Sequence, residues 1–152
     1  MNYKKLRNEL QDYYLNHVNG ISESAFESCA ALREIIFPKN ECLIWERAFK
    51  DCYNLERVEI NEGNTISDEM FLGCRSLKEV IIRGKRTSFY LNSFGLCSLR
   101  RIVFKDTYSY DLDKRYIDNI LQGVIADKGD KLTIEFKDKT IVKTNRNKKI
   151  WD

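Results

Sequence analysis

Residues 66–82 read ISDEMFLGCRSLKEVII, and this arrangement occurs four times in the chain. A phenylalanine recurs with separations of 23, 22 and 23 residues, and a cysteine follows each phenylalanine three positions later. The phenylalanines are Phe26, Phe49, Phe71 and Phe94, and the cysteines are Cys29, Cys52, Cys74 and Cys97. A period in the twenties is typical of stacked copies of one small motif, or rungs. It predicts a solenoid, and solenoids mostly bind other molecules.

The second half of each copy predicts a strand. A leucine follows the cysteine, and apolar residues then alternate with variable ones, as in a strand with one buried face. These apolar positions are Leu32-Ile35-Phe37, Leu55-Val58-Ile60, Leu77-Val80-Ile82 and Leu99-Ile102-Phe104. We expect them to point inward with the Phe and Cys side chains. A buried Leu, Ile or Phe contributes ~1.5–3 kcal/mol, so at least three stacked rungs are needed before burial outweighs chain entropy.

The four copies resemble the BspA-type leucine-rich repeat family, whose rungs run roughly I-x-x-x-A-F-x-x-C-x-x-L-x-x-I-x-I-P. The resemblance covers residues 21–104. Only Pro38 keeps the proline after the strand, Met70 and Ser93 replace the small alanine, and the fourth copy is one residue shorter. The resemblance implies a parallel strand stack on the concave side and short turns or strand fragments opposite.

The segments on either side of the repeats are predicted to cover the two ends of the stack. Apolar residues at helical spacing predict an amphipathic helix over 2–18. A stronger apolar stripe over 112–125 predicts a second helix, with Asp111 as its N-cap and Gly129 just past its end. Residues 131–143 are predicted to form a fifth strand and its hairpin partner.

The predicted fold is therefore an α/β-type repeat solenoid of about four to five rungs with a parallel strand face. We expect a single domain over 1–152. Its parts are an N-terminal capping helix (1–20), four leucine-rich repeats (21–106), a helix and hairpin cap (107–143) and a basic tail (144–152).

Composition narrows the class of protein further. The chain has 152 residues, of which 43% are hydrophobic and 32% charged, enough for one continuous core. No apolar run approaches the ~20 residues that span a bilayer, and the charged N-terminus does not resemble a signal peptide. With no glycosylation sequon and an odd number of cysteines, these features predict a cytoplasmic protein that does not act at a membrane.

The cysteines are interpreted as a ladder of small buried hydrophobes in a reducing compartment, in preference to a zinc site or disulfides. Cys42 lies in a connecting loop and is expected to be the most exposed thiol. The only histidine, His17, is assigned to the first helix, and no catalytic motif such as G-x-S-x-G, H-E-x-x-H or a phosphate-binding loop is present. We therefore expect no enzymatic activity, cofactor, metal or small-molecule substrate.

The charges are unevenly distributed along the chain. Residues 22–69 contain eleven acidic and five basic residues, whereas residues 75–105 contain one acidic and eight basic residues. Rungs stack in sequence order, so this predicts a molecule with an acidic and a basic end. Ile36, Ile81 and Val103 are apolar residues at outward strand positions and could form an apolar strip framed by charge. The predicted partner-binding residues are Arg83, Lys85, Arg86, Arg100, Arg101, Lys105, Ile81 and Val103.

Three functions are compatible with this pattern. The first is a protein-binding module, for instance a small inhibitor, that docks an acidic or mixed surface through the strand face and the basic end of the solenoid. The second is binding of RNA or a ribonucleoprotein through the same end, with Tyr90, Tyr108 and Tyr110 available for base stacking. The third is implied by the family resemblance alone: members on cell surfaces bind host or matrix proteins, and such adhesion would require export.

Overall fold

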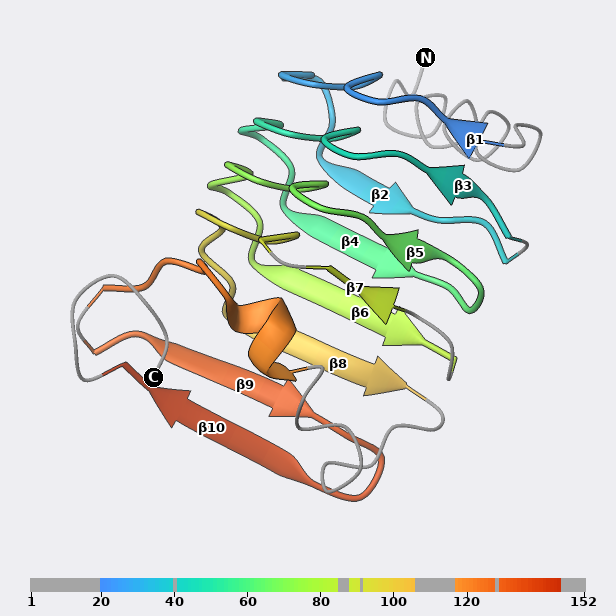
Figure 1. Ribbon diagram of the computed structural model, residues 1–152. Coiled ribbons are helices and arrows are strands. Elements are labelled where there is room, and N and C mark those ends of the chain that lie inside the picture. Colours follow the sequence, from blue (N-terminus) through green and yellow to red (C-terminus); the bar gives the residue numbers. More distant parts are fainter. Residues whose placement is uncertain are drawn as a thin grey trace, which may run out of the picture.

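The computed structural model describes residues 20–39, 41–84, 88–90, 92–105, 117–127 and 129–145. These residues form a β-solenoid in which each rung contributes one strand to a large sheet and one short strand to the opposite side (Figure 1). The predicted leucine-rich-repeat stack with a parallel strand face is therefore confirmed.

The large sheet has the strand order β10-β9-β8-β6-β4-β2. All neighbouring pairs are parallel except β9 and β10, which form an antiparallel hairpin. The strands are β2 (Glu34–Ile36), β4 (Arg57–Ile60), β6 (Glu79–Arg83), β8 (Arg101–Lys105), β9 (Lys131–Glu135) and β10 (Thr140–Thr144). Residues 131–143 thus contain the fifth parallel strand and hairpin partner that the sequence predicts. The outward side of β2, β4, β6, β8 and β9 is the long-strand face.

The opposite side carries two pairs of short parallel strands. β1 (Gly20–Ile21) pairs with β3 (Leu43–Ile44), and β5 (Thr65–Ile66) pairs with β7 (Ser88–Phe89). Between these pairs, the Ser67 hydroxyl donates a hydrogen bond of 2.6 Å to the Ile44 carbonyl. The outward side of these four strands, with the residue that follows each strand, is the short-strand face.

The core between the two faces contains a stack of phenylalanine rings. The ring centroids of Phe26 and Phe49, Phe49 and Phe71, and Phe71 and Phe94 lie 5.3, 5.6 and 5.3 Å apart, with nearly parallel planes. Phe49, Phe71 and Phe94 are buried, whereas Phe26 in the first rung remains 38% exposed. The inward Phe ladder is confirmed for the inner rungs, and the prediction is wrong for Phe26 because the described residues place a neighbouring rung on only one side of its ring.

The cysteines beside this stack satisfy backbone carbonyls of the preceding rung. The thiols of Cys52, Cys74 and Cys97 donate to the carbonyls of Phe26, Phe49 and Phe71 at 3.1, 3.2 and 3.1 Å. All three cysteines are buried, as predicted. The repeated cysteine therefore combines small size with a hydrogen-bond donor, which a buried carbonyl needs.

Cys42 does not follow its prediction. Its side chain is buried, and burial raises the pKa of its thiol, while Cys29 in the first rung is only half-buried. The loop that carries Cys42 folds back against the core beside Ile44, so its position between strands does not expose it.

Each rung turns through two left-handed backbone positions that the sequence analysis did not identify. They lie two residues before and two residues after each phenylalanine; the residues are Ser24, Ser28, Arg47, Asp51, Glu69, Gly73, Asn92 and Leu96. Gly73 is the only glycine of this set, and a Cβ there would lie 2.0 Å from the Asp51 Oδ1 atom. The equivalent corners of the other rungs hold Ser28, Asp51 and Leu96, so the left-handed conformation favours glycine here without requiring it.

The helical caps are not supported. The only helix among the described residues covers 117–121, and Gly123 follows it in a left-handed conformation that ends it well before the predicted end near Gly129. The predicted N-terminal helix at 2–18 and the N-cap Asp111 lie outside the described residues.

The chain after this helix instead continues the rung pattern. The Leu96 amide donates to the Gly123 carbonyl at 2.8 Å, and the Ile125 amide donates to the Cys97 carbonyl at 2.9 Å. Ile117, Ile120 and Val124 join the core next to the last phenylalanine rung. This segment and the β9–β10 hairpin therefore extend the stack beyond the fourth rung.

Candidate functional site

The predicted binding residues were expected to form an exposed basic surface, and the structure separates them. Arg83 and Arg101 lie on the long-strand face, and Lys105 lies at the end of β8. Arg100 lies on the side of the stack, where it contacts the Asp130 carboxylate at 2.6 Å and the carbonyls of Ser98 and Leu99. Lys85 and Arg86 lie outside the described residues.

The arginines of the long-strand face are neutralised by carboxylates of neighbouring rungs. The Arg57 guanidinium contacts three carboxylates, those of Glu34, Glu59 and Glu79, with Nη2–Oε2 of 2.8 Å to Glu59 and Nε–Oε2 of 2.9 Å to Glu79. The Arg83 Nε atom lies 2.5 Å from the Glu59 Oε1 atom. These pairs bridge rungs one to three.

Arg101 extends this network to the hairpin. Its guanidinium contacts Glu135 in a two-point arrangement, Nε–Oε1 at 2.7 Å and Nη2–Oε2 at 2.9 Å, and also contacts Glu79. A two-point contact fixes the guanidinium plane as well as its position. We call the whole set the ion-pair lattice; its members are Glu34, Arg57, Glu59, Glu79, Arg83, Arg101 and Glu135.

The lattice lowers the pKa values of its carboxylates. Burial opposes ionisation of Glu59, but hydrogen bonds from Arg83 and Arg57 outweigh it and hold its pKa below the usual value. The hydrogen bonds from Arg101 lower the pKa of Glu135, against a smaller effect of burial. Both groups are therefore ionised at neutral pH.

The lattice also covers the apolar residues that were expected to be exposed. Ile81 and Val103 are opposite each other in the β6–β8 register, but only 5% and 6% exposed. In the same row of the sheet Glu59 lies beside Ile81 and Glu135 lies beside Val103. The prediction of an exposed apolar strip is wrong for Ile81 and Val103, because long ion-paired side chains cover apolar neighbours. Ile36, on the last strand of the sheet, remains exposed.

The lattice could have been recognised from the repeat period. Its first row is occupied by Glu34, Arg57, Glu79 and Arg101, which pair in register and alternate in sign. Their separations follow the phenylalanine period, with the shortened fourth rung accounted for. Summing charges over whole rungs concealed this alternation.

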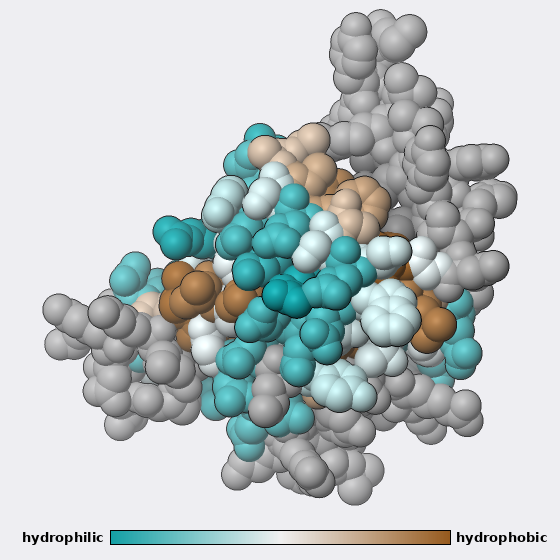
Figure 2. All heavy atoms as spheres, turned by 45° about the horizontal axis from the view of Figure 1, so that its top comes forward, coloured by the Kyte–Doolittle hydropathy of each residue, from teal (hydrophilic) through white to brown (hydrophobic). Residues whose placement is uncertain are grey.

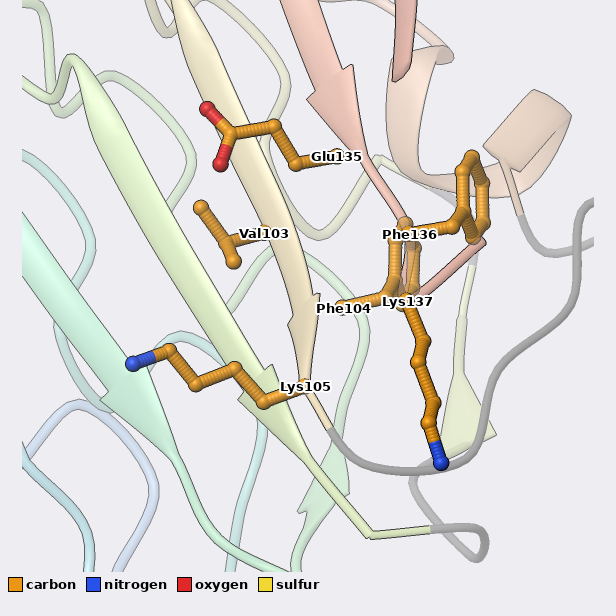
Figure 3. A pocket seen from close by; sticks show the side chains of 6 residues that line it. All are labelled: Val103, Phe104, Lys105, Glu135, Phe136 and Lys137. Atoms are coloured by element: carbon orange, nitrogen blue, oxygen red, sulfur yellow. The ribbon is translucent and has the colours of Figure 1, made fainter. Parts of the chain in front are cut away.

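Two lysines at one end of the long-strand face are not part of the ion-pair lattice. Lys105 is exposed at the end of β8, and Lys137 is exposed two residues beyond β9. Neither forms a direct ion pair with a described carboxylate, although the charge of Lys105 also lowers the pKa of Glu135. They line a hollow of about 350 Å³ with Val103, Phe104, Glu135 and Phe136. Figure 3 shows Val103, Lys105 and Glu135 on the outward side of the β8–β9 pair and the two phenylalanines on the other side. Lys105 and Lys137 form the basic rim, and Arg83 of the lattice lies next to Lys105 in register.

The short-strand face is different in composition. It exposes Leu43 and Trp45 on the second rung and Tyr90 on the fourth. The residues Glu46 and Asp68 follow its strands and are exposed. Figure 2 shows that hydrophobic areas on this side of the molecule are small and separated by hydrophilic ones.

The aromatic residues proposed for base stacking are not placed beside the basic rim. Tyr90 lies on the short-strand face, opposite the sheet that carries Arg83 and Lys105. Tyr108 and Tyr110 lie outside the described residues. The described part of the chain therefore does not bring Tyr90 together with Arg83 or Lys105 on one surface.

The described residues contain no group of three His, Cys, Asp or Glu side chains arranged to hold a metal ion. The same residues include no helix of the length and apolar character that a membrane span requires.

Stacked rungs with one long parallel sheet define a leucine-rich-repeat β-solenoid, a class that typically serves as a binding scaffold. The sequence profile of the BspA type leucine-rich repeat region, with six copies, matches residues 8–115. The chain therefore belongs to the BspA-type leucine-rich repeat family. Neither a curated protein nor a solved structure shows significant similarity to the chain.

Proposed function

We propose that this protein is a non-enzymatic interaction module that binds an acidic protein segment at the basic rim. The proposal rests on a difference between the arginines and the lysines of the long-strand face. Its arginines are paired with carboxylates of the chain itself, whereas Lys105 and Lys137 are exposed, outside the lattice and beside a hollow. Exposed cations that form no direct ion pair within the chain can attract and orient an acidic partner.

The hollow supports contact by a side chain of the partner. Its volume of about 350 Å³ is at the lower end of ligand-sized clefts, and its lining includes the apolar residues Val103 and Phe136 as well as the two lysines. An acidic residue followed by an apolar one would match this lining. The role as a small inhibitor, and a cytoplasmic location, remain predictions within this proposal.

The test reverses the charge of the two lysines. Lys105→Glu combined with Lys137→Glu should abolish capture of the partner from nuclease-treated lysate, and the purified partner should show the same loss in direct binding. The matched control is Lys78→Glu with Lys131→Glu, two exposed lysines elsewhere on the described surface. The control should bind like the unmodified protein.

Equal capture by both double variants would overturn the proposal. Capture that disappears on nuclease treatment, before any substitution is made, would favour RNA or a ribonucleoprotein instead.

A further inference from the structure

We infer that the short-strand face is a second binding surface, which takes a protein segment rich in arginine or lysine. In this arrangement one cationic side chain of the partner lies between Trp45 and Tyr90, above Ser67. This surface is separate from the basic rim and would bind a segment of opposite charge.

The exposure of three large side chains is the first observation. Leu43, Trp45 and Tyr90 are 71%, 62% and 53% exposed, in a molecule whose other repeat-position hydrophobes are mostly buried. Each follows or belongs to a short strand whose alternate residue, Ile44 or Phe89, packs into the core. Tryptophan and tyrosine are the side chains most enriched among strongly contributing interface residues.

Small residues surround these side chains in the neighbouring rungs. Leu43 lies in register with Gly20, and a Cβ at Gly20 would come within 2.9 Å of the Leu43 carbonyl oxygen. Ser22 and Ser67 hold the positions equivalent to Trp45 in the first and third rungs. The large side chains therefore stand above their neighbours.

The rung spacing leaves a gap of suitable width between the two aromatic residues. Trp45, Ser67 and Tyr90 occupy the same position in successive rungs, four residues before the phenylalanine. Neighbouring strands are ~4.8 Å apart, so the two aromatic positions are separated by roughly 10 Å. A guanidinium or ammonium group above Ser67 would lie roughly 5 Å from each, within the ~6 Å range of a cation–π contact.

The adjacent charges indicate the sign of the partner. Glu46 follows Trp45, and Asp68 follows Ser67; both are exposed, and neither forms an ion pair with a described residue. Glu23 holds the equivalent position in the first rung, where it pairs with Arg47. Two uncompensated carboxylates next to aromatic side chains complement a cationic segment.

The experiment selects peptides from a phage-displayed library of random dodecapeptides on the full-length protein. Synthetic copies of the selected peptides are then titrated by fluorescence polarisation. We expect arginine and lysine to be enriched over their library frequency. Trp45→Ala and Tyr90→Ala should each weaken binding by tenfold or more, and Glu46→Gln with Asp68→Asn should weaken binding and reduce its salt dependence.

Control variants test whether the loss of any exposed aromatic or acidic side chain weakens binding. Tyr53→Ala removes an exposed aromatic residue from the side of the stack, and Glu56→Gln with Asp118→Asn removes two exposed acids elsewhere. These variants should bind the peptides unchanged, as should Lys105→Glu with Lys137→Glu. Thermal melts of all variants establish that they are folded.

The inference is overturned by any of three results. These are the absence of selected peptides, selection without enrichment of basic residues, or equal affinity of the peptides for the unmodified protein and for both aromatic variants.

Discussion

On the long-strand face Arg57 contacts three carboxylates, whereas on the short-strand face Glu46 and Asp68 contact no described cation. Both faces belong to the same rungs, but most of the charged residues lie on the long-strand face. The difference arises from register, because a charge on the long strands meets an opposite charge one rung away. The sum of charges along a solenoid therefore says little about which charges a partner can reach.

The largest expected effect concerns the core that both faces share. Phe71→Ala removes a fully buried ring from the middle of the aromatic stack and should destabilise the protein by ~3–5 kcal/mol. Phe26→Ala should cost less than half of this, because its ring is partly exposed and stacks on one neighbour. Chemical denaturation followed by circular dichroism measures both, and an unchanged transition for Phe71→Ala would contradict the inward ladder.

The sequence predicted this core well because the period is carried by large apolar side chains. The phenylalanine, cysteine and leucine positions repeat, and a repeated apolar position must be buried between copies of itself. Features that depend on the ends of the stack or on contacts between rungs were missed. Phe26 is exposed because it is in the first rung, Gly123 ends the helix early, and Ile81 is covered by side chains from other rungs.

The candidate site was predicted less well, because it too depends on contacts between rungs. Arg83 and Arg101 are on the expected face, but their carboxylate partners lie 22 to 34 residues away and are found only by aligning the rungs. Lys137 was missed because it lies beyond the four repeats, although it lines the same hollow as Lys105. Leu43 lies at a position where the other copies have Gly, Thr or Ser, and Trp45 and Tyr90 lie at a position where the remaining two copies have Ser; this contrast was available in the sequence.

The second prediction removes the centre of the ion-pair lattice. Arg57→Met leaves Glu34, Glu59 and Glu79 without their shared cation and should destabilise the protein by about 1–2 kcal/mol. Arg33→Met is the matched control, since Arg33 forms a single exposed pair with Glu56 at 3.6 Å. Its cost should stay below about 0.5 kcal/mol in the same denaturation experiment. Equal losses for the two variants would remove the energetic distinction between the lattice and an ordinary surface pair.

The third prediction uses pH. The folded-state pKa values of Glu59 and Glu135 are lowered, so their contribution to stability is present above the unfolded value of about 4.3 and is lost as the pH falls through the folded values. Denaturation midpoints should decrease between about pH 5 and pH 3. Glu59→Gln with Glu135→Gln should flatten this dependence.

The comparison for the pH experiment is Glu56→Gln with Asp118→Asn, two exposed acids outside the lattice. This control should keep the slope of the unmodified protein. A slope that is the same in both double variants would show that the lattice carboxylates titrate normally.

The smallest expected effect is on the short-strand face. Trp45→Ser should change the free energy of unfolding by less than about 0.5 kcal/mol, because the side chain is mostly exposed and its neighbours are small. Denaturation monitored by circular dichroism avoids reliance on tryptophan fluorescence. A loss of several kcal/mol would mean that Trp45 supports the fold and is not free for a partner.

The most direct test of the contrast between the two faces is hydrogen exchange at the arginine side chains, observed by ¹H–¹⁵N NMR. The Nε atoms of Arg57, Arg83 and Arg101 each donate to a carboxylate of another rung, at 2.9, 2.5 and 2.7 Å. Their Nε–H signals should persist at neutral pH, while those of Arg33 and Arg75 should exchange rapidly. Rapid exchange at all five side chains would contradict the ion-pair lattice. It would mean that Arg57, Arg83 and Arg101 are accessible to a partner.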